Sequence, residues 1–411
     1  MKKNKFRILV WVFAICHLPS AICHSQSITN SPYSRYGLGE LQYSGFANNI
    51  SMGGIYNALQ NDTTAPFFIN VSNPASLAST RLTVFDFGLK SNTMKLETAD
   101  KSFSSNQTAL SYMALAFPVA KWWGASFGLL PYSNVGYKIY DTVTVNNIGK
   151  VNYSYEGEGG INQVYLGNGF RKKNFSAGVN VSYLFGDMAY FSRDSFPKAS
   201  NYFNTKLSQT TRVSDLYYSF GAQYRMQLKK NWSLTLGATG NVQNNINVKK
   251  TTFAATYTNM FGVEVMKDTI INEEDVKDTL TIPLMLGGGF VLKKGDKWLF
   301  GFDYSMQNWS AFNSFGQSGL LKNSQRMAVG AQFIPNKNAG TKEPYFKKVL
   351  YRAGFRYTTS YLDSKKITND LNSIPLIDYA ITFGAGLPLR KVKIGETYSQ
   401  SIINIGFEIG Q

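Results

Sequence analysis

The chain has 411 residues, a formal net charge of +17, 15% aromatic residues and 36 glycines. Its only cysteines and histidines are Cys16, Cys23, His17 and His24, all within the first 25 residues. Without that segment the chain has no thiol and no imidazole, which excludes disulfides, His- or Cys-based metal sites and histidine-dependent catalysis. We therefore predict a protein that is not an enzyme and that holds neither cofactor nor metal.

Residues 1–25 are typical of a secretory signal peptide. A basic start is followed by an apolar stretch at residues 8–15 and a cleavage point after Ser25. Cys23 offers the alternative of a lipoprotein, although Ile22 stands where a small residue is expected. Export argues against nucleic acid as a partner, so the positive charge favours contact with lipopolysaccharide or lipid phosphates.

The composition after residue 25 indicates a membrane protein built from strands. No run of 18 or more apolar residues is present, so a membrane-spanning helix is not expected. An exported chain rich in aromatic residues and glycine, yet moderately polar, is typical of an outer-membrane β-barrel, in which every second residue of a strand faces lipid. We predict an all-β transmembrane antiparallel barrel in the bacterial outer membrane.

Alternating apolar and polar residues predict thirteen strands from about residue 81 onward. In chain order the strands are expected at 82–90, 108–120, 123–133, 159–170, 175–186, 213–228, 232–243, 278–292, 297–309, 324–334, 348–360, 376–389 and 399–410. The connections after even-numbered strands are mostly short and basic, whereas the others are long and polar, the longest being an acidic loop at 244–277. This places the short turns in the periplasm and the long loops outside the cell.

An odd number of strands is unusual, because bacterial single-chain barrels have an even number. Either two strands are merged in this interpretation, or a fourteenth strand is missing from the sequence. We expect the latter, and therefore a barrel of the 14-strand type. An open edge within lipid would leave main-chain groups without hydrogen bonds.

Residues 26–80 precede the barrel at 81–411 and show little alternation. A fourteen-stranded barrel is too wide for its own side chains to fill. The apolar residues of 26–80 must be covered somewhere, which favours a plug in the lumen over a solvated periplasmic tail.

The stretch "SMGGIYNALQNDTTAPFFINVSNPASLA" (51–78) resembles the N-terminal hatch of the FadL family, the outer-membrane transporters of long-chain fatty acids and aromatic hydrocarbons. Gly53, Gly54, Asn61, Asp62, Asn73, Pro74, Ala75 and Leu77 carry this resemblance. The stretch 122–137 is similar to the family's interrupted third strand, through Pro131, Tyr132 and Gly136. The "APFFINV" stretch departs from the family's usual aromatic pair before Asn-Pro-Ala, and the final strand is absent.

The resemblance implies uptake of a hydrophobic small molecule, a fatty acid or an aromatic hydrocarbon. Proline within a sheet deletes a ladder hydrogen bond, so Pro131, with Gly128, Tyr132 and Gly136 nearby, is expected to open the wall sideways into the membrane. The alternative is that Pro131 merely ends a short strand. Movement around Gly53, Gly54, Asn73, Pro74, Ala75 and Leu77 is the implied gate.

Two other functions remain open. One is a plugged barrel that acts as a partner in protein secretion or surface attachment, like the type IX secretion shuttle barrels, and then contacts other envelope proteins. The other is a porin for small solutes. Large ordered outer loops and the lack of a lipophilic cavity would favour the partner, and a continuous water path would favour the porin. In each case we expect a monomer.

Overall fold

The computed structural model describes residues 29–43, 45–61, 67–97, 102–197, 202–261, 263–314, 317–319, 321–340, 342–368, 375–394 and 397–411. The signal-peptide prediction and Asp62 lie outside these residues. Within them, no helix is long and apolar enough to cross a membrane.

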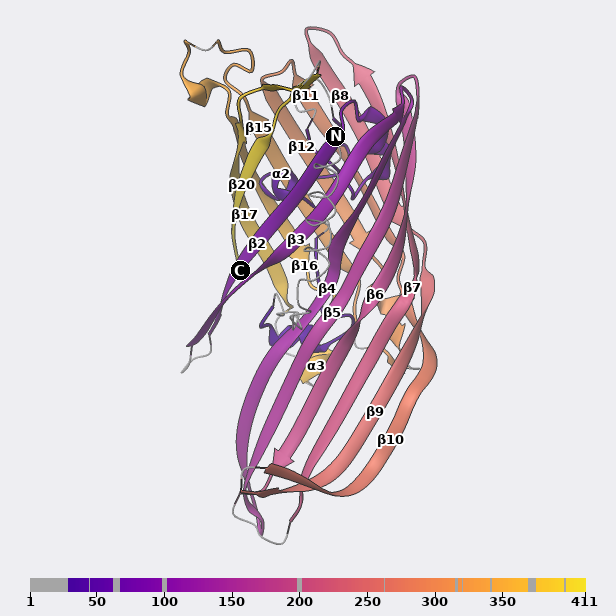
Figure 1. Cartoon of the computed structure of the whole chain (residues 1–411), viewed down its shortest axis with the longest axis vertical. Helices are drawn as coiled ribbons and strands as arrows, with labels where there is room; N and C mark the ends of the chain where they lie inside the picture. Colours follow the sequence, from indigo (N-terminus) through magenta and orange to yellow (C-terminus); the bar gives the residue numbers. More distant parts are fainter. Residues whose placement is uncertain are drawn as a thin grey trace, which may run out of the picture.

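A single curved antiparallel sheet forms the wall of the molecule (Figure 1). Its strands are β2 (Val84–Glu97), β3 (Ser102–Ala120), β4 (Trp123–Val145), β5 (Gly149–Lys172), β6 (Phe175–Ser195), β7 (Asn204–Gln227), β8 (Trp232–Asn241), β9 (Asn244–Met260), β10 (Val263–Ile282), β11 (Met285–Lys294), β12 (Trp298–Gln307), β15 (Ser324–Phe333), β16 (Leu350–Thr359), β17 (Ile377–Pro388) and β20 (Ile402–Gly410). The predicted all-β barrel fold is thereby confirmed.

Two pairs of these strands act as single, bent strands. β8 pairs with one end of β7 and β9 with the other end, so β8 and β9 form one bent strand. In the same way, β11 pairs with β8 and β10 pairs with β9, so β10 and β11 form the second bent strand. Asn241 and Pro283 mark the bends, where the Asn241 side-chain amide donates to the Pro283 carbonyl at 3.0 Å. With each pair counted once, the described wall follows the predicted order of thirteen strands.

The strands β4 to β7 are longer than their patterns predict, and β9 and β10 lie largely where a loop was predicted. The prediction of a loop at 244–277 is wrong, because β9 and β10 pair through most of it, from Met260↔Val263 to Asn244↔Ile282. β10 is polar and acidic and is exposed along most of its length, so it lacks the alternation used to recognise strands. β4–β7, β9 and β10 continue beyond the rest of the wall, at the end predicted to face outward, and form the outer extension (Figure 1). The terms outer and periplasmic follow that prediction.

The two edges of the wall are β2 and β20. β2 pairs with β3 and β20 pairs with β17, and no ladder joins β2 to β20 among the described residues. Both strands run outward, so direct pairing between them would have to be parallel, unlike all the wall pairings described.

The described residues before the wall, 29–80, form a plug inside its curve (Figure 1). Its elements are η1 (Pro32–Arg35), β1 (Glu40–Leu41), α2 (Ala47–Ile50) and η2 (Pro74–Ser79). β1 pairs with Asn134 and Ser133 at the middle of β4, whereas η2 packs beside Gly124 at the periplasmic end of that strand. The plug thus runs lengthwise through the lumen.

Short elements complete the two ends. On the outer side lie η3 (Trp309–Ala311), β13 (Asn313–Ser314), β14 (Gln317–Ser318) and α3 (Ser364–Thr368); on the periplasmic side lie η4 (Tyr345–Lys347), β18 (Val392–Ile394) and β19 (Thr397–Ser399). Three clusters of buried apolar residues join plug and wall. The core of this protein is therefore the packing of the plug, not a layer between two sheets.

Candidate functional site

Glycines of the wall allow the main chain of the plug to pack directly against the strands. At Gly169 of β5 and Gly178 of β6, an added Cβ would stand 2.5 and 2.4 Å from main-chain atoms of Pro74. Any side chain there would displace the plug. The same close approach to the plug main chain occurs at Gly124, Gly237, Gly330 and Gly354.

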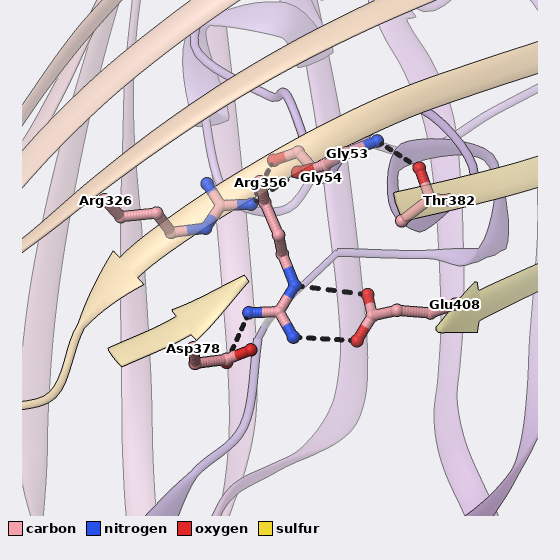
Figure 2. Close-up of polar contacts among 7 residues, drawn as sticks. All are labelled: Gly53, Gly54, Arg326, Arg356, Asp378, Thr382 and Glu408. Atoms are coloured by element: carbon pink, nitrogen blue, oxygen red, sulfur yellow. Dashed lines mark hydrogen bonds and ion pairs between the residues drawn. The ribbon is translucent and has the colours of Figure 1, made fainter. Parts of the chain in front are cut away.

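Gly53 and Gly54 contact the wall opposite η2, at β15, β16 and β17. Both adopt positive φ, 67° and 73°, which glycine tolerates best. The Gly53 N–H donates to Thr382 Oγ1 at 2.8 Å, and both carbonyls accept from Arg326 Nη2 at 2.9 Å (Figure 2). This turn is held by polar side chains of two strands, Arg326 of β15 and Thr382 of β17.

Asp303 holds the next turn of the plug. It lies at the centre of β12 with 1% of its surface exposed. Its Oδ2 accepts from the main-chain N–H groups of Tyr56 and Asn57, at 2.6 and 2.9 Å. Hydrogen bonds to a buried carboxylate are among the stronger ones, contributing about 1.5–3 kcal/mol each. The plug is thus anchored by a carboxyl group that the wall keeps out of water.

The Asn73-Pro74-Ala75 triplet begins η2. Asn73 is fully buried and its Oδ1 accepts from the Ala75 N–H at 3.1 Å, while Pro74 occupies the first turn. The Asn73 side-chain amide also donates to the Asn57 carbonyl, which links the start of η2 to the turn that Asp303 holds. Ala75 and Leu77 are buried against β4–β7. Asn73 therefore caps η2, and the triplet packs against the wall.

The wall splits between β3 and β4. Their ladder runs from Ala120↔Trp123 only as far as Met113↔Leu129. Beyond this point β3 stays with β2, and β4 stays with β5 (Figure 1). Pro131 lies two residues beyond the last pair, and a register shift separates it from Ser133 on the β5 side. β4 continues through Pro131 to Val145, so Pro131 does not end the strand.

The other residues of the predicted opening lie along this split. Gly128 faces β3, where a Cβ would meet the Met113 carbonyl at 2.4 Å. The Tyr132 carbonyl accepts from the Gln42 N–H at 2.9 Å, and Gly136 exchanges two hydrogen bonds with the Ser34 hydroxyl. The plug therefore covers the edge of β4 where β3 leaves it.

The outer mouth is closed by a packed apolar cluster. Leu38 of the plug, Ile161, Leu184 and Leu280 of the outer extension, and Trp309 of η3 are each at most 1% exposed. Tyr361 lies against Trp309, with ring centroids 4.8 Å apart. Burial raises the pKa of Tyr361 well above its ordinary value, so its hydroxyl stays protonated and donates to the Gly39 carbonyl. This cluster resembles the core of a soluble domain.

A pocket lies at the periplasmic end, between plug and wall. Its volume is about 470 Å³ including open solvent, and Met52, Phe68 and Leu299 are among its apolar lining. Arg352 enters it with 8% exposure and donates to Gln332 Oε1 at 2.9 Å and Asn404 Oδ1 at 2.7 Å. No cluster of metal-binding side chains is found among the described residues.

An ion-pair cluster ties the last strands of the wall together. Arg356 of β16 donates to both carboxylate oxygens of Glu408 on β20, at 2.8 and 3.3 Å, and to Asp378 of β17 at 2.6 Å (Figure 2). A planar guanidinium suits this two-pronged contact. The cluster reinforces β20, which pairs with a single strand, β17, in the part of the chain that the structure describes.

The structure arranges the predicted site residues in three places. Gly53 and Gly54 face β15–β17, the group from Asn73 to Leu77 faces β4–β7, and the group from Gly128 to Gly136 lies at the β3–β4 split. Asp303 and Arg326 were not predicted from the sequence as site residues. Both stand within predicted strands, and an inward-facing charge was the only feature that could have marked them.

Comparisons with known proteins agree with this fold. The solved toluene transporter TodX of P. putida matches with a TM-score of 0.52 and 14% identity, over 90% of this chain and 98% of that one. The CymD monoaromatic hydrocarbon channel (TM-score 0.50, 12% identity, 91% and 94% covered) and a Pseudomonas aeruginosa FadL homologue (0.50, 14%, 90% and 91%) also match. The predicted resemblance to the FadL family is confirmed at the level of the fold.

No curated protein matches the sequence. A family model does match, over residues 5–411, and its description is BamG. Because that match spans nearly the whole chain, the protein is a member of the BamG family, built on the barrel fold of outer-membrane hydrocarbon channels.

Proposed function

We propose that this protein is a plugged outer-membrane barrel that acts as a partner of other envelope proteins, in protein secretion or surface attachment. The closed outer mouth is the observation that carries the proposal. A channel that admits molecules from outside needs an entrance there, whereas Leu38, Leu280 and Trp309 fill that position with a buried cluster.

The plug supports the same function. It is fixed to the wall by the Asp303 carboxylate, by Arg326 and by close main-chain contacts at wall glycines. To clear the lumen, these contacts would have to break together. A barrel that holds a firmly attached plug is better suited to position other proteins than to conduct solutes.

The outer extension supplies a surface for such partners. It stands clear of the rest of the wall, and β10 is exposed along most of its length. Met260, Phe261 and Val263 at its tip are exposed apolar residues, with acidic and basic side chains nearby. Exposed apolar residues rimmed by charge are typical of protein contact sites.

The test is to purify the protein from outer membranes in mild detergent and to identify by mass spectrometry what accompanies it. We expect an envelope protein in stoichiometric amount and no bound lipophile. In planar bilayers the wild-type protein should not conduct ions. Gly178→Val, which displaces the plug, should conduct, and Gly340→Ala, where a Cβ meets nothing within 4 Å, serves as the matched control. A conducting wild-type protein without a protein partner would refute the proposal.

Uptake of a hydrophobic small molecule is the second candidate, favoured by the β3–β4 split beside Pro131. In this function the molecule leaves the lumen sideways into the membrane, and movement of the plug around Asn73 gates its path. An apolar solute gains little by passing through water, so a lateral exit is physically reasonable. A fatty acid or aromatic hydrocarbon that co-purifies in stoichiometric amount, and that Asn73→Ala removes, would support this candidate over the first.

A further inference from the structure

The edge of β4 that faces the split presents its main-chain groups in a fixed alternation. In an antiparallel pair, every second residue directs both its N–H and its C=O toward the same neighbour. The Tyr132 carbonyl accepts from Gln42, Asn134 pairs with Glu40, and Gly136 bonds to Ser34. The main-chain N–H and C=O groups of the even-numbered residues from Tyr132 onward therefore point away from β5 and toward the split.

This alternation continues without interruption to the tip of the hairpin. The β4–β5 ladder has no register shift from Ser133↔Ile161 to Val145↔Gly149. The N–H and C=O groups of Lys138, Tyr140, Thr142 and Thr144 thus all point toward the edge that β3 has left. The edge is regular, free of proline and rich in β-branched residues.

The plug occupies only the first part of this edge. β1 pairs with Ser133 and Asn134, and the Ser34 side chain takes the place of a strand at Gly136. Further out, the Thr142 N–H bonds to the neighbouring Asp141 carboxylate at 2.8 Å. Among the described residues, the main-chain groups of Lys138, Tyr140 and Thr144 that point to this edge have no hydrogen-bond partner.

The opposite edge of the outer extension, β10, differs in the ways that prevent strand addition. It contains three register shifts, between Met266 and Asp268, Thr269 and Ile271, and Glu273 and Val276. Bulges and charged side chains are the usual protection of an exposed edge strand. The β4 edge has neither bulge nor proline beyond Ser133.

We propose that the β4 edge from Lys138 to Val145 binds an extended segment of a partner protein, which adds to the sheet as a strand antiparallel to β4. The inference rests on the proposed partner function and specifies where one partner binds. The segment continues the line that β1 begins, so the plug and the partner share one edge. Its residues over Ile139 and Val143 are apolar, and the one over Asp141, which lies between them on the same face of β4, is polar. On the other face, its residues over Lys138 and Tyr140 are polar.

Strand addition depends on the main chain, and this dependence gives a sharp test. In Tyr140→Pro/Thr144→Pro, two edge donors are removed, whereas the β4–β5 hydrogen bonds, made by the odd-numbered residues, are kept. The matched control is Tyr140→Ala/Thr144→Ala, which removes the side chains and keeps the donors. Benzoylphenylalanine placed at position 142 reports contact with a partner in whole cells. Position 154 is the negative site, because it lies on β5, which pairs with a strand on each side.

We expect a cross-link from position 142 but not from 154, to an extended segment with alternating apolar residues. The proline variant should lower the cross-link at least tenfold, and the alanine variant should leave it within about twofold. Unchanged heat-modifiable migration on gels shows that the barrels fold. A partner retained by the proline variant, or lost equally in the alanine variant, would overturn the edge inference alone. A wild-type protein that neither cross-links nor co-purifies with any protein would overturn the proposed function as well.

Discussion

Replacing Asp303 by alanine should loosen the plug without disturbing the wall. The substitution leaves the N–H groups of Tyr56 and Asn57 buried without an acceptor. Each hydrogen bond to a charged group contributes about 1.5–3 kcal/mol, and water admitted to the vacated space offsets part of the loss. We take about 3 kcal/mol for the pair, which corresponds to a factor of about 100 in the opening equilibrium.

Amide hydrogen exchange in detergent, followed by mass spectrometry, measures this opening directly. The peptide containing Tyr56 and Asn57 should exchange on the order of 100-fold faster in Asp303→Ala than in the wild type. Asp303→Asn keeps an acceptor oxygen of the same shape and should give a smaller increase. Peptides of β6, remote from β12, serve as the internal control. A change below threefold in a folded Asp303→Ala protein would show that the carboxylate does not anchor the plug.

Three further substitutions test other contacts. Asn73→Ala removes the cap of η2 and the tie to the other half of the plug, so the plug should lose about 1–2 kcal/mol and trypsin should cut faster after Arg81; an unchanged rate would contradict the role of the cap. Gly178→Val should prevent the plug from seating and raise ion conductance, whereas Gly340→Ala should leave conductance at the wild-type level. Trp309→Ala should lower stability by about 3–5 kcal/mol and reduce the temperature at which the barrel changes migration on gels; an unshifted temperature would show that the outer cluster is not a structural core.

The strands of the wall were predicted well where apolar and polar residues alternate along them, and poorly where they do not. β12 and β15 alternate as membrane strands should, and their predicted limits differ from the structure by at most two residues. β10 was predicted to be a loop because both of its faces meet water, so no residue along most of it needs to be apolar. Alternation reports burial on one face, and it cannot detect a strand exposed on both.

The plug shows the same limit at the level of single residues. Asn73 and Gly53 stand out in the sequence because a cap and a turn are local features. Asp303 is 246 residues from Asn57 in the chain, and only the curl of the sheet brings the two together. Contacts of that kind depend on the register of every strand between them, which a local pattern does not determine.

The lengthwise path of the plug has a consequence for the order of assembly. Glu40 lies beside Asn134 and Leu77 beside Gly124, so the segment between them passes along about ten residues of β4, roughly 33 Å. A finished cylinder would have to be threaded to reach this state. We therefore expect the strands to gather around a segment that is already in place and that packs against the wall glycines. On this pathway the plug is a template for closure, and a change that weakens its seating should slow barrel formation before it alters the finished protein.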